Sequence, residues 1–147
     1  MILPQDLALK DREILTCSVN ARSARANKPE INDFISTCEP HVLAVQETWG
    51  FDTRARGYKC LSNHREKRGG GVSITLKSEL KLKLDFRQSD ANIEIIVVSN
   101  SDIIICNLYR QPKGNIPSFC NELKKILTNY QTEITYHKKW EISILTF

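Results

Sequence analysis

Short apolar runs separated by polar segments extend along most of the chain, and their spacing predicts alternating strands and helices. Glu13–Val19 is rich in apolar and β-branched residues, which is typical of a strand. After a polar loop, Asn20–Ala26, apolar residues recur at the spacing of one helical face: Ile31, Phe34, Ile35 and Cys38. Val42–Val45 is wholly apolar, as expected of a strand that is covered on both faces.

The predicted helix has recognisable start and stop signals. Asn27 is a candidate N-cap, Glu30 stands at the capping-box position, and Pro29 fits only the first turn. Pro40 ends the helix. The result is a strand–helix–strand unit, and such crossovers join parallel strands with right-handed topology in about 98% of cases. Asn20 and Glu47 both follow the carboxyl ends of these strands, so we expect them at the same edge of the sheet, where ligands bind in open α/β sheets.

The middle of the chain predicts hairpins. The expected strands are Tyr58–Ser62, Gly71–Leu76, Leu80–Phe86, Ile93–Val98 and Ile103–Leu108. The segment between the last two, at 99–102, has strong turn chemistry. A second helix is predicted over Ser118–Tyr130, and Ile142–Phe147 is a final β-like run. No internal repeat is apparent.

Composition narrows the class of protein. The 147 residues indicate one domain, and no apolar run approaches the roughly 20 residues that span a bilayer. The N-terminus does not have the pattern of a signal peptide, and five scattered cysteines without a C-x-x-C pair indicate reduced thiols and no zinc site, so we expect an intracellular protein, nuclear or cytoplasmic. Cys17 and Cys106 lie in apolar runs and are expected to be small core residues. The net charge of +4 is compatible with a polyanionic partner.

Four polar residues follow predicted strands and are candidates for chemistry. Glu47 is suited to Mg²⁺, which is held by one or two carboxylates together with water and phosphate. Asn20 and Tyr109 can hydrogen-bond a phosphate oxygen, and Arg110 can pair with a phosphate in bidentate fashion. Taken singly, each has another interpretation: a solvated glutamate, a turn residue, an aromatic anchor and a solvated arginine.

A basic and then glycine-rich run, 65–71, is a further candidate. Its glycines allow close approach to a phosphate chain, although no Lys-Ser/Thr follows them as in a P-loop. The alternative is the mobile tip of a hairpin. His64 and His137 are isolated in the sequence and are expected to be surface residues.

The order of these segments resembles one known family. The sequence shows NARS after the first strand, LAVQETW at the second, RGGGV in the hairpin and CNLYRQP at a later strand. Together they resemble the first half of an endonuclease/exonuclease/phosphatase domain, most closely the apurinic/apyrimidinic-type endonuclease of non-LTR (LINE-type) retrotransposons. The likeness extends from Glu13 to Tyr130.

This resemblance implies a fold and a site. The fold is α/β, a partial four-layer α/β sandwich (DNase I-like) with essentially one mixed sheet and two helices, in a single C-terminally truncated domain over 1–147. By resemblance, Asn20 organises the site, Glu47 ligates the divalent metal and Tyr109 contacts the scissile phosphate. Mg²⁺ is the implied metal, with Mn²⁺ as a substitute, and DNA is the implied partner. No membrane and no small-molecule cofactor is implied.

The family's later motifs are missing from this chain. Neither Gly-Asp-Phe-Asn nor the terminal Asp-His pair occurs in it. Since the family uses these residues to orient the attacking water and to transfer protons, the resemblance implies a partial, inactive DNA endonuclease domain of retrotransposon origin. We also expect an exposed apolar sheet face. Two other functions stay open: a non-catalytic nucleic-acid-binding or interaction module, and a phosphoesterase of the same superfold with another substrate.

Overall fold

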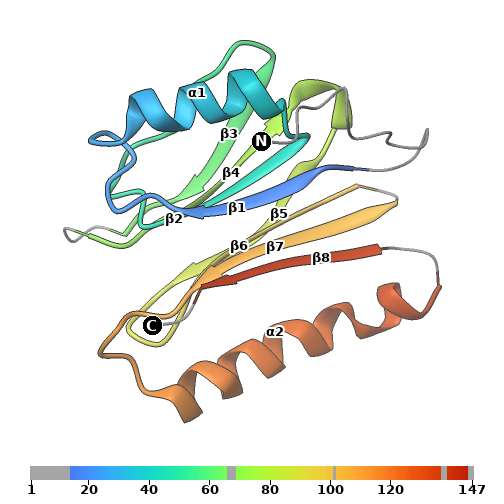
Figure 1. The fold of residues 1–147 in the computed structure, drawn as a ribbon. Helices are drawn as coiled ribbons and strands as arrows, with labels where there is room; N and C mark the ends of the chain where they lie inside the picture. Colours follow the sequence, from blue (N-terminus) through green and yellow to red (C-terminus); the bar gives the residue numbers. More distant parts are fainter. Residues whose placement is uncertain (1–13, 66–68, 101, 137–138, 146–147) are drawn as a thin grey trace.

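The chain folds into four layers, helix, sheet, sheet and helix, as a computed structural model shows (Figure 1). The structure describes residues 14–65, 69–100, 102–136 and 139–145. Helix α1 (Lys28–Cys38) covers the outer face of one sheet, and helix α2 (Ile116–Tyr136) covers the outer face of the other. No helix in the described part of the chain is both long and apolar enough to cross a bilayer.

Each sheet has four strands. The first sheet has the order β1-β2-β4-β3, formed by β1 (Thr16–Asn20), β2 (Val42–Gln46), β4 (Val72–Lys77) and β3 (Tyr58–Asn63). The second sheet has the order β5-β6-β7-β8, formed by β5 (Lys83–Ser89), β6 (Glu94–Ser99), β7 (Ile103–Tyr109) and β8 (Lys139–Leu145). The expectation of a partial α/β sandwich is confirmed, but the expectation of essentially one mixed sheet is wrong.

The predicted crossover at the start of the chain is confirmed. Strands β1 and β2 are parallel, and Asn20 pairs in register with Gln46, the residue before Glu47. A second crossover, which the sequence did not indicate, joins the parallel strands β7 and β8 through α2. In both crossovers the helix follows the carboxyl end of a strand, so α1 and α2 begin at the same end of the molecule (Figure 1).

The start of α1 differs in detail from its prediction. Asn27 occupies the N-cap position, but its side chain makes no capping hydrogen bond. Its Nδ2 instead donates to the carbonyl oxygens of Ala21, at 2.7 Å, and Ser23, at 3.3 Å. Asn27 therefore fixes the loop after β1 rather than closing the helix. The helix ends at Cys38, where Glu39 adopts the left-handed conformation, one residue before Pro40.

The two sheets pack face to face, and this packing buries the inner apolar faces. The central cluster takes residues from both sheets: Val42, Val72, Ile74, Leu76, Leu82, Ile96, Val98, Ile103, Ile105 and Tyr109. Phe119, Ile126 and Tyr130 of α2 pack on the outer face of the second sheet, and Ile31 and Ile35 of α1 pack on that of the first. The expectation of an exposed apolar sheet face is wrong, because the second sheet covers the inner face of the first.

The remaining predicted elements are found with shifted bounds. The expected strand Leu80–Phe86 is divided, since Ser78–Leu80 forms a 3₁₀ turn and β5 begins at Lys83. The final expected strand, Ile142–Phe147, corresponds to β8 at Lys139–Leu145, and Phe147 lies outside the described residues. Cys106 is fully buried, as expected, while Cys17 is only partly buried beside the cluster under α1.

Candidate active site

A hydrogen bond between the two sheets defines the candidate site. Tyr109 ends β7 of the second sheet, and its Oη donates to Oε1 of Glu47, which follows β2 of the first sheet, over 3.3 Å. The tyrosine is only 1% exposed. Asn20 and Glu47 follow neighbouring strands of the first sheet, as expected, whereas Tyr109, which a single mixed sheet would have placed beside them, reaches the site from the opposite sheet.

The backbone at Glu47 is held in an unusual conformation. Glu47 and Trp49 both lie in the left-handed region, with φ of 53° and 52°. Hydrogen bonds from both sides hold this turn: Ser23 N donates to the carbonyl oxygen of Glu47 at 3.0 Å, and Trp49 N donates to that of Gly70 at 2.9 Å. The backbone that carries the Glu47 carboxylate is thereby held between the loop after β1 and the glycine run.

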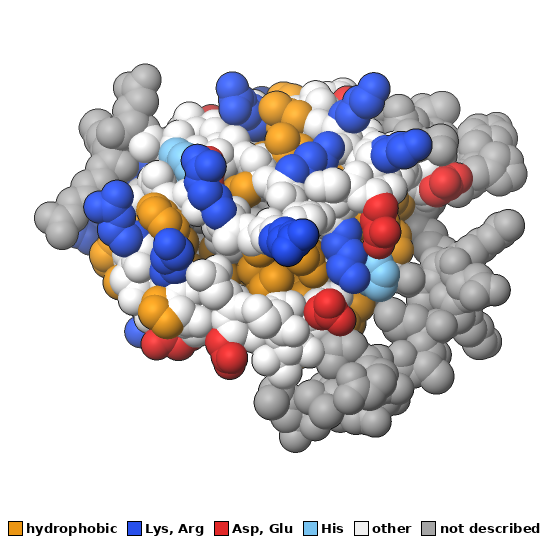
Figure 2. Space-filling model, turned by 90° about the horizontal axis from the view of Figure 1, so that it is seen from above, with side chains coloured by type: hydrophobic (Ala, Val, Ile, Leu, Met, Phe, Trp, Pro, Cys, Tyr) orange, Lys and Arg blue, Asp and Glu red, His pale blue; other side chains and the backbone are white. Residues whose placement is uncertain are grey.

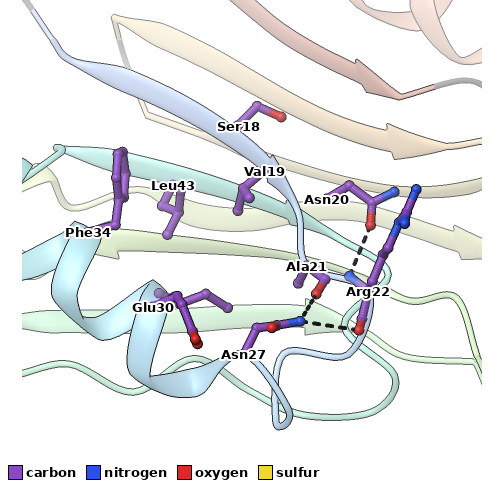
Figure 3. A pocket seen from close by; sticks show the side chains of 10 residues that line it. Ser18, Val19, Asn20, Ala21, Arg22, Asn27, Glu30, Phe34 and Leu43 are labelled. Atoms are coloured by element: carbon purple, nitrogen blue, oxygen red, sulfur yellow. Dashed lines mark hydrogen bonds between the residues drawn. The ribbon is translucent and has the colours of Figure 1, made fainter. Parts of the chain in front are cut away.

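Asn20, at the end of β1, presents a donor without an acceptor. Its Oδ1 accepts a hydrogen bond of 3.0 Å from the backbone N–H of Arg22 (Figure 3). Its Nδ2 is buried and has no hydrogen-bond partner in the described part of the chain. A buried N–H group without a partner costs about 1–3 kcal/mol, so this position favours a bound acceptor such as water or a phosphate oxygen.

Arg110, the fourth predicted site residue, is placed differently. It is 7% exposed, and its Nη1 donates to the carbonyl oxygens of Gly114, at 3.1 Å, and Gln111, at 3.4 Å. The guanidinium thus closes the loop between β7 and α2. Phosphate binding by Arg110 stays a prediction.

Glu94 is a residue of this site that sequence reasoning missed. It is fully buried at the start of β6, where it pairs in register with Tyr109. Burial raises the pKa of Glu94, and the Glu47 carboxylate raises it further, while Arg65 and the N–H of Gly71 lower it. A usable signal was present, since an acidic residue stands immediately before the apolar run 95–98.

The protonation of Tyr109 follows from the same surroundings. Burial, and then the negative charge of Glu47, raises the pKa of Tyr109 to about 12; Glu94 adds to this rise. The hydroxyl is therefore protonated at neutral pH and acts as a hydrogen-bond donor. In this structure its one proton is donated to Glu47. If a cation engaged Glu47 instead, the hydroxyl could donate to a phosphate oxygen and stabilise negative charge there.

A second missed group supports the turn that carries Glu47. Thr48 is fully buried, and its Oγ1 lies 2.9 Å from Nδ1 of His64. Nε2 of His64 lies 2.6 Å from Oδ1 of Asp52. The expectation that His64 is an isolated surface residue is wrong, because it links two loops beside the site. His137 lies outside the described residues.

The donor set fits a divalent cation that is held mainly by water and phosphate. Glu47 is a partly buried carboxylate that makes no ion pair within the described residues, and the charge of Glu94 acts on the same site. A cation would offset this negative charge, and Mg²⁺ commonly binds proteins through one or two carboxylates. The described residues contain no group of three or more His, Cys, Asp or Glu side chains arranged to hold a metal. Glu47 is the residue that would hold the ion, and the ion would polarise a bound phosphate.

An open cavity lies beside the site, between β1 and α1. Its volume is about 440 Å³, and its lining is mainly apolar (Figure 3). Val19 points into it from β1, and Phe34 borders it from α1. Asn20 connects this cavity to the candidate site.

Comparisons with known proteins find similarity in structure only. No protein-family model matches the chain, and no curated protein matches it. Among solved structures, the 3′ phosphatase NExo from Neisseria, bound to a product DNA hairpin, matches with a TM-score of 0.63 and 17% identity over 88% of this chain and 56% of its own. The endonuclease domain of TRAS1, a telomere-specific non-LTR retrotransposon, matches with a TM-score of 0.59 and 13% identity over 88% of this chain and 58% of its own.

A third solved structure, TDP2 from C. elegans, has a TM-score of 0.56 and 12% identity over 93% of this chain and 48% of its own. The chain thus spans about half the length of the structures that it matches. At these identities the likeness establishes the fold. The chain has a DNase I-like fold, with two sheets and two helices in its described residues.

Proposed function

We propose that this chain is the first part of a metal-dependent DNA endonuclease domain of retrotransposon origin, which binds DNA through its site but does not cleave it alone. The observation that carries the proposal is the hydrogen bond from Tyr109 to Glu47, which joins a carboxylate and a neutral donor from opposite sheets. Nδ2 of Asn20, which has no hydrogen-bond partner among the described residues, supports it, because a phosphate oxygen would satisfy this donor. The likeness to the TRAS1 endonuclease domain supports the retrotransposon branch.

The charge near the site suits a polyanion. Figure 2 shows Lys and Arg side chains spread over the face that α1 covers. Exposed cations in the described residues include a group that we call the basic rim, which follows β1, begins α1 and continues in the loop after β2: Arg22, Arg25, Lys28 and Arg54. Lys28 and Arg54 line the same small cavity, and no residue of the rim forms an ion pair within the described part.

The proposed lack of cleavage rests on the residues that the chain contains. Glu47, through a cation that it holds, and Tyr109 can orient a phosphate, but in-line hydrolysis also needs a group that positions and deprotonates water. General acid–base assistance alone is worth about 10²–10⁴ in rate. The motifs that supply this function in the family, Gly-Asp-Phe-Asn and Asp-His, do not occur in the sequence.

The test combines DNA binding with a cleavage assay. A fluorescently labelled duplex is titrated with purified protein in Mg²⁺ and in EDTA, and supercoiled plasmid is incubated with Mg²⁺ or Mn²⁺. We expect affinity that depends on the metal and falls with Glu47→Ala, together with no nicking above background. Nicking that Glu47→Ala abolishes would show that the chain cleaves alone. A DNA affinity that is the same in Mg²⁺ and in EDTA, and is unchanged in Glu47→Ala, would favour the non-catalytic binding module.

A further inference from the structure

Arg65 is held flat against the glycine run at the edge of the site. Its Nε donates to the carbonyl oxygen of Gly69 over 2.6 Å and lies 3.2 Å from Oε1 of Glu94. A Cβ on Gly70 would lie 2.3 Å from Nε and Nη2, so only glycine lets the guanidinium approach the backbone this closely. The side chain is 23% exposed. Such enclosure restricts a side chain that is otherwise highly flexible.

Glu94, at the start of β6, forms an ion pair with this arginine. Its Oε2 accepts a hydrogen bond from Gly71 N over 3.2 Å, and its Oε1 has no hydrogen bond in the described part of the chain. Arg65 is therefore the only cation that pairs with this fully buried carboxylate among the described residues. Burying a carboxylate costs free energy unless a cation pairs with it, and even a buried ion pair stabilises a fold weakly. Packing alone therefore does not explain the presence of the Glu94–Arg65 pair.

The pair lies at the site itself. Glu94 is the register partner of Tyr109, and both Glu94 and Arg65 act electrostatically on its hydroxyl. The glycine run also supports the Glu47 turn, because the carbonyl oxygen of Gly71 accepts a hydrogen bond from Thr48 N over 3.3 Å. Arg65 thus borders the space beside Glu47 and Tyr109.

The terminal nitrogens of Arg65 retain hydrogen-bonding capacity. Within the described residues, Nη1 and Nη2 make no hydrogen bond, since the one bond to Gly69 uses Nε. Arg110 differs, because its Nη1 is bound to carbonyl groups of its own loop. An arginine that is oriented through Nε and keeps donors at its terminal nitrogens is suited to a phosphate oxygen.

We propose that Arg65 binds a non-bridging oxygen of a DNA phosphate at this site through Nη1 and Nη2, with Glu94 as the positioning residue that fixes its orientation. The proposal rests on the proposed function, since it assumes that the site receives a phosphodiester. The competing interpretation is a purely structural role, in which Arg65 only links the glycine run to Glu94 of the second sheet.

The experiment compares Arg65→Lys, which keeps the charge but loses the planar fork, with Arg56→Lys, a matched change in an exposed arginine at the far end of β3. Affinity for a labelled duplex in Mg²⁺ is measured at fixed salt, with melting temperature as a check of folding. We expect Arg65→Lys to weaken binding about tenfold and Arg56→Lys to leave it unchanged. Glu94→Gln should weaken binding less, and should add little when it is combined with Arg65→Lys.

A second readout follows the arginine directly. In ¹⁵N-labelled protein, the Nε–H resonance of Arg65 should shift on titration with inorganic phosphate, and this shift should be absent in Glu94→Gln. Duplex affinity that is unchanged in Arg65→Lys but lost in Glu47→Ala would overturn the role of Arg65 and leave the proposed function standing. Absence of metal-dependent duplex binding in the unmodified protein would refute the proposed function. In that case the phosphate titration alone tests the role of Arg65. An Nε–H resonance that does not shift overturns the proposal that Arg65 binds phosphate.

Discussion

The side-chain amide of Gln46 donates a hydrogen bond of 2.6 Å to Oδ1 of Asn107, and this bond joins the two sheets through their buried interior. Nδ2 of Asn107 completes the link by donating to the carbonyl oxygens of Val45, at 3.0 Å, and Ser73, at 2.8 Å. Gln46 precedes Glu47, and Asn107 lies two residues before Tyr109. The relative position of the two site residues therefore depends on a polar link in an otherwise apolar interface.

Removing this link should destabilise the protein. We expect Asn107→Ala to lower the free energy of unfolding by about 2–4 kcal/mol, because it removes three buried hydrogen bonds, the one from Gln46 and the two to the carbonyl groups of Val45 and Ser73. Urea denaturation followed by circular dichroism measures the change. Asn32→Ala on α1 is the control, since the Asn32 side chain makes no hydrogen bond in the described part and the expected change is within about 0.5 kcal/mol. A similar loss in both variants would contradict the interpretation.

The link between Thr48 and His64 should affect the metal site. Thr48→Val removes the hydroxyl that lies 2.9 Å from His64 Nδ1, and Thr48 directly follows Glu47. We expect a loss of about 1 kcal/mol in stability and weaker Mn²⁺ binding by titration calorimetry, because the Glu47 turn loses a support. Thr128→Val, at an exposed position of α2, should change neither quantity. Mn²⁺ affinity that is unchanged in Thr48→Val would separate the histidine link from the metal site.

Stability should depend on pH through His41. Its Nδ1 accepts a hydrogen bond of 3.0 Å from Leu15 N, and burial, followed by the charge of Lys77, lowers the pKa of His41 below its ordinary value of 6.5. The unfolded chain therefore takes up the proton at a higher pH than the folded chain does. The His41 contribution to stability is complete above pH 6.5 and is lost as the pH falls below that value towards the folded pKa.

Urea denaturation at several pH values from 7.5 to about 5 tests this expectation. In His41→Asn the amide oxygen can accept the same hydrogen bond without titrating, so the part of the slope near pH 6 that is due to His41 should disappear. An identical pH dependence in the two proteins would assign the slope to other groups.

The basic rim should govern the salt dependence of DNA binding. Replacing Arg25, Lys28 and Arg54 by glutamine removes three exposed cations. If each contacts a phosphate, the slope of log affinity against log salt should fall by about 0.9 for each residue. Duplex titrations at several salt concentrations measure the slope. The control is the same replacement by glutamine of three exposed lysines on α2 and β5: Lys124, Lys125 and Lys83. An equal effect of the two triple variants would indicate non-specific attraction by net charge.

Local patterns predicted most of the elements, because each strand and helix carries its own periodicity. The crossover through α1 and the pairing of Asn20 beside Glu47 followed from chain order alone. The division into two sheets could not be predicted in this way. Both sheets use apolar strands of similar length, and the step from β4 to β5 is only a short turn, Ser78–Leu80, without a distinctive signal.

The site was predicted in part for a related reason. Glu47 and Tyr109 stand at strand ends and were named from their positions, and the structure brings them together. Glu94 and His64 were missed, because their partners are distant in the sequence: Tyr109 pairs with Glu94 across strands, and Asp52 reaches His64 from another loop. A polar residue next to an apolar run indicates a buried partner but does not say which one.

The left-handed backbone at Glu47 is unfavourable for folding, so stability does not explain why this residue is a glutamate. A non-glycine residue in this region costs of the order of 1–3 kcal/mol, and Glu47 contributes little to the apolar core in return. Glycine or asparagine at this position would relieve the backbone, so Glu47→Gly should raise the melting temperature while it removes the carboxylate. Folding alone therefore does not require glutamate at position 47, and the proposed binding of a cation by its carboxylate would account for this residue.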